Sequence, residues 1–143
     1  ALYGNIYDHL SADFVYANGV HLTSNCRQYP KGTLPRQIGE SIVGTKGRMD
    51  FATVRGEGPN PQELEHVTLV KSILGVIPYT NHGQAVAEST MTCIMGREAA
   101  YSGLEITWDM IMNSKQDLQP KAFGYELRMD EPPLPVPGIY KFV

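Results

Sequence analysis

Two stretches of alternating apolar and polar residues open the chain and predict a β-hairpin over residues 5–28. A two-residue turn at Asn18-Gly19 would mismatch the apolar faces of the two arms. A three-residue loop, with Gly19 in the left-handed conformation of a G1 bulge, pairs Phe14 with Leu22 instead. We expect this second register, because a slip of one residue would move a whole apolar face into water. It joins Ile6, Leu10, Ala12, Phe14 and Tyr16 on one arm to Val20, Leu22, Ser24 and Cys26 on the other.

A second hairpin is predicted over residues 40–54, with arms at 40–43 and 48–54. Gly44-Thr45-Lys46-Gly47 joins the arms, and the same bulge geometry would pair Val43 with Met49. Segments rich in Pro and Gly at 29–38 and 55–59 predict loops on either side of this hairpin.

Helical patterns follow the hairpins. Asn60, Pro61 and Glu63 form a strong helix start, and apolar residues at 64, 67, 70 and 74 continue this helix until Gly75. A longer helix is predicted over 84–102; it is apolar almost all round, so we expect it to lie between a sheet and another layer. A short helix should follow Thr107 to about residue 113, with Ile106 and Ile111 as its hydrophobic staple.

These elements predict an α+β fold. We expect a mostly antiparallel sheet covered on one face by the helices at 61–74 and 84–102, in one domain over residues 1–130. The residues from 131 to 143 contain several prolines and predict an extended tail, which could cross a neighbouring chain or a further domain.

Composition narrows the classes of function. The 143 residues are 42% hydrophobic and 19% charged, as in a soluble globular protein, with a net charge of −3 and scattered Lys and Arg. Nucleic acid is therefore not an expected partner. No apolar run approaches the roughly 20 residues that span a bilayer, so we expect no membrane partner either. The chain starts without Met or a signal-peptide pattern, which suggests a fragment; cytoplasmic localisation is favoured, and export of a longer parent is left open.

The sequence lacks the motifs of several common cofactor and metal sites. No Gly-x-Gly-x-x-Gly follows a predicted strand, and the loop at 44–47 lacks Walker spacing, so we expect no cofactor on this chain. The four histidines do not have metal-ligand spacing, and we expect no metal. Cys26 and Cys93 are expected as reduced thiols, although a bridge is left open because sequence does not give their separation.

A series of short motifs is the most specific feature of the chain. In order they are Tyr7-Asp8-His9, Asn18-Gly19-Val20, Cys26-Arg27-Gln28, Gly44-Thr45-Lys46-Gly47, Asn60-Pro61, Ala87-Glu88-Ser89-Thr90-Met91-Thr92, Met95-Gly96-Arg97, Ala100-Tyr101-Ser102-Gly103, Thr107-Trp108-Asp109 and Asn113-Ser114. Their order and spacing resemble the C-terminal domain of the glucose-fructose oxidoreductase / inositol dehydrogenase (Gfo/Idh/MocA) family. Glu98 departs from that pattern, where an apolar residue is expected.

The resemblance implies a two-domain parent whose N-terminal Rossmann domain binds NAD(P). The lysine, aspartate and histidine of the family's proton-transfer set have no counterpart here, so no catalytic residue is expected in this chain. The chain would be the substrate-side and oligomerisation domain of a sugar or cyclitol oxidoreductase, inactive alone, with the Rossmann domain and a sugar or polyol as partners. Family members assemble through the open sheet face, so the resemblance also implies a homo-oligomer.

Two groups of residues are candidates for substrate contact. His82, with Asn81 and Gln84, comes just before the long helix, and His9 faces Arg27 across the first hairpin. An exposed loop and an ordinary solvated cross-strand set remain the alternatives for these two groups. Two other functions stay open: a non-catalytic carbohydrate-binding or oligomerisation module, and an NAD-dependent glycoside-cleaving relative of the same family.

Overall fold

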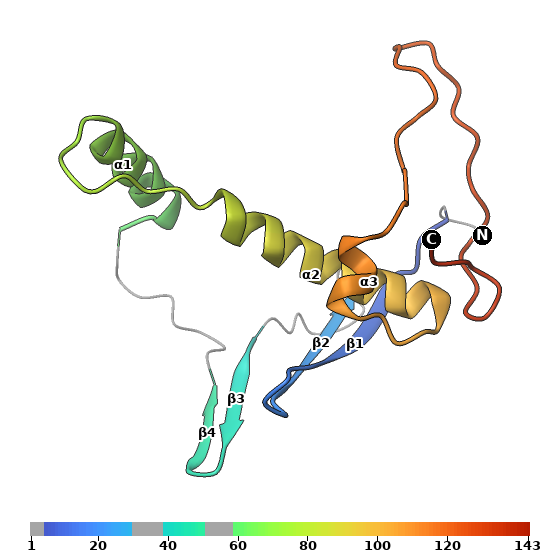
Figure 1. Cartoon of the computed structure of the whole chain (residues 1–143), viewed down its shortest axis with the longest axis horizontal. Helices are drawn as coiled ribbons and strands as arrows, with labels where there is room; N and C mark the ends of the chain where they lie inside the picture. Colours follow the sequence, from blue (N-terminus) through green and yellow to red (C-terminus); the bar gives the residue numbers. More distant parts are fainter. Residues whose placement is uncertain (1–4, 30–38, 51–58) are drawn as a thin grey trace. The chain divides into compact units, whose positions relative to one another are not determined.

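The computed structural model describes residues 5–29, 39–50 and 59–143. The chain divides into two compact units, one formed by Ala1–Tyr29 with Gly83–Val143 and the other by Pro30–His82. The first unit holds strands β1 and β2 with helices α2 and α3, and the second holds β3, β4 and α1 (Figure 1).

The first hairpin has the predicted register. β1 (His9–Val15) pairs antiparallel with β2 (His21–Arg27), and Phe14 lies opposite Leu22. The loop closes with Gly19 at a φ of 78°, and the Gly19 N–H donates to the Tyr16 carbonyl at 2.8 Å. The left-handed glycine lets a three-residue loop match both apolar faces, so the G1 bulge is confirmed.

The apolar face of β1 packs against α2 (Gly83–Ser102). Burial alternates along β1, with Leu10, Ala12 and Phe14 on the enclosed side. The approach is close at Gly96, where an added Cβ would lie 2.8 Å from Cζ of Phe14. Glycine therefore permits the contact between helix and hairpin.

Helix α2 is covered only toward its C-terminal end. Its residues before Met91 are exposed, whereas Gly96, Glu98 and Ser102 are buried. The helix ends where Gly103 takes a φ of 72°, as predicted. The expected position between a sheet and another layer is thus found only in part, because the second half of the helix has neighbours in this unit and the first half is exposed.

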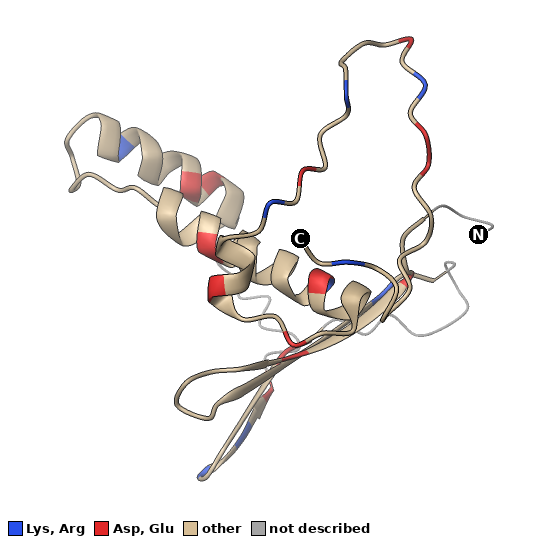
Figure 2. Ribbon diagram, turned by 45° about the vertical axis from the view of Figure 1, so that its right-hand side comes forward, with Lys and Arg blue, Asp and Glu red and all other residues tan. Residues whose placement is uncertain are grey.

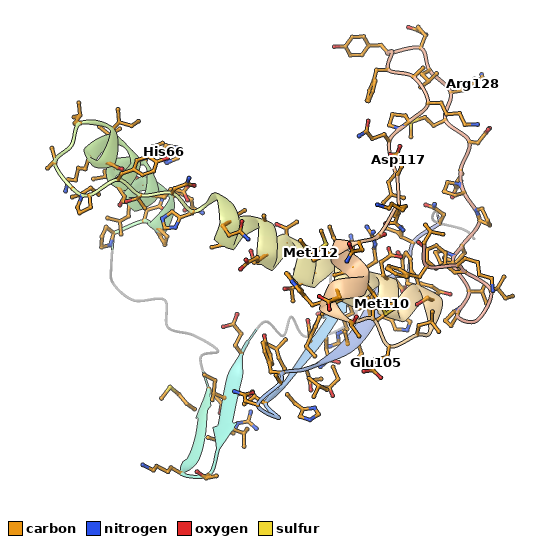
Figure 3. All side chains as sticks on the ribbon, viewed as in Figure 1. His66, Glu105, Met110, Met112, Asp117 and Arg128 are labelled. Atoms are coloured by element: carbon orange, nitrogen blue, oxygen red, sulfur yellow. The ribbon has the colours of Figure 1, made fainter. Side chains whose placement is uncertain are left out.

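Helix α3 (Trp108–Met112) and the chain end complete the first unit. The Thr107 side chain caps α3 by accepting from the Met110 N–H at 3.2 Å, and Ile106 and Ile111 are both buried, as the staple predicts. Met110 and Met112, which come directly before and after Ile111, are exposed (Figure 3). The chain end returns to α2, and the Gly138 N–H donates to the Ser102 carbonyl at 2.9 Å.

The second hairpin corrects one prediction. β3 (Ser41–Gly44) pairs with β4 (Gly47–Asp50), and Met49 lies opposite Ile42 rather than Val43. The turn is a two-residue loop with Gly47 at a φ of 138°. All residues of both strands are exposed, so no buried face selects a register, and the glycines permit the shorter loop. The predicted arm residues 51–54, and most of both predicted loops, lie outside the described residues.

Helix α1 (Pro61–Ile73) begins and ends as predicted. The Asn60 side chain accepts from the Gln62 N–H, and Pro61 occupies the first turn. At the other end the Val76 N–H donates to the Lys71 carbonyl at 2.9 Å, with Gly75 at a φ of 70°, which is a Schellman ending.

The described residues thus form an α+β arrangement with two small antiparallel sheets. We expected one sheet covered by both helices. The described residues instead form two separate two-stranded sheets, and of the two helices only α2 packs against a described strand. Cys26 and Cys93 are free and exposed thiols.

Candidate functional site

The outward face of the first hairpin carries a row of polar side chains. Because Leu10, Ala12 and Phe14 turn toward α2, the alternate residues of β1 face away from it. The Ser11 hydroxyl donates to the Asn25 side-chain oxygen at 2.7 Å across the strands. This face therefore offers hydroxyl and amide groups in fixed positions, as the register predicted.

Asp13 links two further residues of this face. Its carboxylate lies 2.8 Å from His21 Nδ1 and accepts from the Thr23 hydroxyl at 3.4 Å. Both members of the Asp13–His21 pair are about half exposed. His21 was not among the predicted contact residues. Its diagonal position across the strands from Asp13 could have indicated the pair, because diagonal side chains on one face of a hairpin lie within reach of each other.

His9 and Arg27 are aligned as predicted but use different side-chain partners. Their Cα atoms are paired at the end of the ladder. His9 Nδ1 lies 2.7 Å from an Asp8 carboxylate oxygen, whereas the Arg27 guanidinium lies 5.1 Å from the centre of the Tyr29 ring. Both candidates are exposed, so the hairpin brings the two groups to one end of the polar face without joining them directly.

The candidates around residue 82 are divided between the two units. Asn81 and His82 are exposed and belong to the second unit, and Gln84 belongs to the first. Gln84 Nε2 donates to the Glu88 carboxylate at 2.6 Å, one turn along α2. The structure therefore places Gln84 within a helical side-chain pair.

The most enclosed polar group of the described residues lies at the end of α2. The Glu98 side chain has a relative exposure of 1%. Its Oε1 accepts from Arg97 Nε at 2.9 Å and Nη2 at 2.7 Å, and its Oε2 accepts from the Tyr140 hydroxyl at 2.9 Å. Gln116 closes the group, because it accepts from Arg97 at 2.9 Å and donates to the Tyr140 oxygen at 2.7 Å. We call Arg97, Glu98, Gln116 and Tyr140 the Glu98 cluster.

Burial is the largest cause that raises the pKa of Tyr140 above its ordinary value of 10.0, and the Glu98 carboxylate adds to the rise. Arg97 and Gln116 act in the opposite direction. No buried side-chain N or O atom of the described residues lacks a hydrogen bond. The cluster joins the chain end to α2, because Tyr140 and Gln116 both bond to residues of this helix.

Contacts between aromatic rings also hold the chain end against α2. The Tyr140 ring meets Tyr101 edge to face, with centroids 5.8 Å apart, and Tyr101 lies 5.9 Å from the ring of Tyr7. The Tyr7 hydroxyl donates to the Pro135 carbonyl. Residues near both ends of the described chain thus meet around the end of α2.

The remaining described surfaces hold fewer groups that could bind a ligand. An open depression on α1 is lined by Glu65, His66 and Leu69, with His66 shown on the helix in Figure 3. Figure 2 shows acidic and basic residues alternating along the extended segment after Ser114. Among the described residues no three His, Cys, Asp or Glu gather as a metal site, and none of the described helices is long and apolar enough to cross a membrane.

Comparison of the chain with protein-family models, with curated proteins and with solved structures finds no match.

Proposed function

We propose that this chain is the substrate-side and assembly domain of an NAD(P)-dependent oxidoreductase for a sugar or cyclitol, related to the Gfo/Idh/MocA family, and that the chain alone is inactive. The ordered motifs of the sequence are the basis of the proposal. The observation that supports it best is the hairpin register, which sets His9 opposite Arg27 on an exposed polar face.

The cofactor belongs to another domain in this proposal. A dinucleotide site is built where a parallel strand runs into a helix through a glycine-rich turn. The described strands pair antiparallel and do not form a turn of this kind, which supports placing the cofactor in another domain. In the parent we expect both hairpins to join one sheet, covered on one face by the helices at 61–74 and 84–102. The open polar face of that sheet would join copies into a homo-oligomer.

The proposed substrate contacts follow from the chemistry of a polyol. Its hydroxyl groups both donate and accept hydrogen bonds, and hydroxyl, amide, imidazole and guanidinium groups satisfy them. His9 and Arg27 supply two of these groups beside the bonded Ser11–Asn25 pair. Asn81, His82 and Gln84 would supply more beside the cofactor domain.

Ligand-observed NMR with myo-inositol and with glucose tests this assignment on the purified chain. We expect saturation transfer to the polyol that falls at least about threefold in Arg27→Ala, because a guanidinium fixes hydroxyl pairs with several donors. Arg128→Ala is the matched control, since Arg128 is also exposed but lies in the extended segment (Figure 3).

A fluorescence titration with NADH and an assay for polyol oxidation complete the test. We expect neither tight NADH binding nor turnover by the chain alone. Tight binding or turnover would overturn the proposal, as would equal saturation transfer in the two arginine variants.

A self-standing carbohydrate-binding module is the second candidate. The contact of Arg27 with the Tyr29 ring favours it, because an aromatic ring beside a group with several hydrogen-bond donors suits a sugar. The source gene separates the two: about 150 upstream residues with a dinucleotide-binding glycine pattern favour the oxidoreductase, and a start codon at residue 1 favours the module. A glycoside-cleaving relative would share the parent's architecture and differ in its product.

A further inference from the structure

Helix α1 presents apolar side chains around more than half of its circumference. None of its residues is buried, and Leu64, Val67 and Val70 are 46%, 46% and 52% exposed. Within its unit, neither β3 nor β4 packs against it. A helix with so wide an apolar surface is normally covered.

The residues of this surface are arranged symmetrically about Val67. Leu64 and Val70 lie three residues before and after it, and Glu63 and Lys71 lie four residues before and after it. Residues three and four apart share one helix face, so all five form a single stripe. We call this stripe the α1 seam.

The symmetry makes the seam complementary to itself in one orientation. When two copies of α1 lie antiparallel about a two-fold axis at Val67, Glu63 of each copy comes level with Lys71 of the other. A parallel pair would instead place Glu63 against Glu63 and Lys71 against Lys71. The charge pattern therefore favours the antiparallel pair, which is the self-complementary geometry of a two-fold dimer.

Both charges are available for such a pair. Glu63 and Lys71 are exposed, and neither forms an ion pair within the part of the chain that the structure describes. Leu69 and Ile73 lie on the other flank of the apolar surface, so pairing through the seam leaves a second apolar flank for the protein's own sheet.

We propose that the α1 seam is an interaction surface for a second copy of this chain, with the two helices antiparallel and Val67 at the two-fold axis. The inference goes beyond the proposed function and does not depend on it. A helix of 13 residues is about 20 Å long, so the interface is small and its association depends on protein concentration.

Sedimentation equilibrium of the full chain with charge-reversed variants tests the seam. We expect the wild type to dimerise with rising concentration. Glu63→Lys and Lys71→Glu each set like charges against one another twice, and each should weaken the dimer at least tenfold, about 1.4 kcal/mol. An equimolar mixture of the two variants should recover the dimer, because every cross-seam pair again joins opposite charges.

Glu65→Lys is the control, since it makes the same charge change on the opposite side of α1 and should leave the dimer unchanged. Circular dichroism confirms that each variant keeps its helices. A wild type that stays monomeric, single variants that associate as strongly as the wild type, or a mixture that does not recover the dimer would each overturn the proposal.

Discussion

Glu98 illustrates at the residue scale how a polar side chain is held inside this protein. A buried carboxylate is costly to desolvate unless charge and hydrogen bonds compensate it. Glu98 has the Arg97 guanidinium on one oxygen and the Tyr140 hydroxyl on the other. An apolar residue was expected at this position, and the buried glutamate found there has specific partners instead. One of them, Tyr140, belongs to the chain end.

Tyr140→Phe should lower the free energy of unfolding by about 1–3 kcal/mol, because it removes a hydrogen bond to a charged, buried acceptor. Urea denaturation near neutral pH measures the change. Tyr125→Phe is the control, since the Tyr125 side chain is fully exposed, and it should leave stability unchanged. In a Glu98→Gln background the effect of Tyr140→Phe should shrink, and equal effects in both backgrounds would contradict the coupling.

The raised pKa of Tyr140 also predicts a pH dependence. The unfolded tyrosine loses its proton near its ordinary pKa of 10.0, whereas the folded protein holds the proton more tightly. The stabilisation is thus fully present below that pH and is lost as pH rises through the raised folded value. Unfolding experiments above about pH 9 should show a shallower loss of stability for Tyr140→Phe than for the wild type. Parallel curves would show that Tyr140 does not contribute.

At the scale of elements, the first hairpin packs closely on α2 at Gly96. Phe14 and Ala12 approach the helix backbone at Gly96, with 2.8 Å and 3.5 Å to the position of an added Cβ. Intrinsic propensity favours alanine over glycine in a helix by about 1 kcal/mol. The close approach opposes that preference, so the position reports on packing between the two elements.

Gly96→Ala should therefore destabilise the protein by about 1–2 kcal/mol despite the gain in helix propensity, because the new methyl group meets the Phe14 ring. Thermal unfolding measures the change. Adding Phe14→Leu to the Gly96→Ala background should recover part of the loss, whereas Phe14→Leu alone should destabilise. If Gly96→Ala stabilises the protein, the packing described between α2 and β1 is wrong.

At the scale of the whole molecule, the two units differ in how much they bury. The first unit contains every buried residue of the described chain, including Ile106, Ile111, Glu98 and Ser102. Within the described part of the second unit, no residue is buried. Local stability follows local burial, so the second unit should open more readily when no partner covers it.

Hydrogen exchange should reveal this difference. Amides of α1, β3 and β4 should have protection factors at least about tenfold lower than amides of β1, β2 and the C-terminal half of α2 in a dilute sample. Mass spectrometry of peptic fragments measures the exchange. Protection of α1 should rise with protein concentration if the α1 seam pairs. Equal protection of both units in dilute solution would mean that the second unit has a core of its own.

Much of the candidate site could be predicted where the determining interactions are local. Alternating apolar residues and Gly19 predicted the register that aligns His9 with Arg27. The Asp13–His21 pair and the Glu98 cluster were not predicted. The first depends on a diagonal cross-strand contact, and the second joins Glu98 to Tyr140, 42 residues later in the chain.

By itself the sequence determined the first hairpin and the ends of the helices, because turn glycines, side-chain caps and apolar spacing act over a few residues. Gly75 and Gly103 end their helices as predicted, and Asn60 and Thr107 cap theirs. The register of β3 and β4 was not determined by the apolar pattern, because both strands are exposed and no buried face distinguishes the alternatives. Only the tertiary structure decided the enclosure of Glu98, because Gln116 and Tyr140 meet it in space from distant parts of the chain, and a pattern along the chain does not record such contacts.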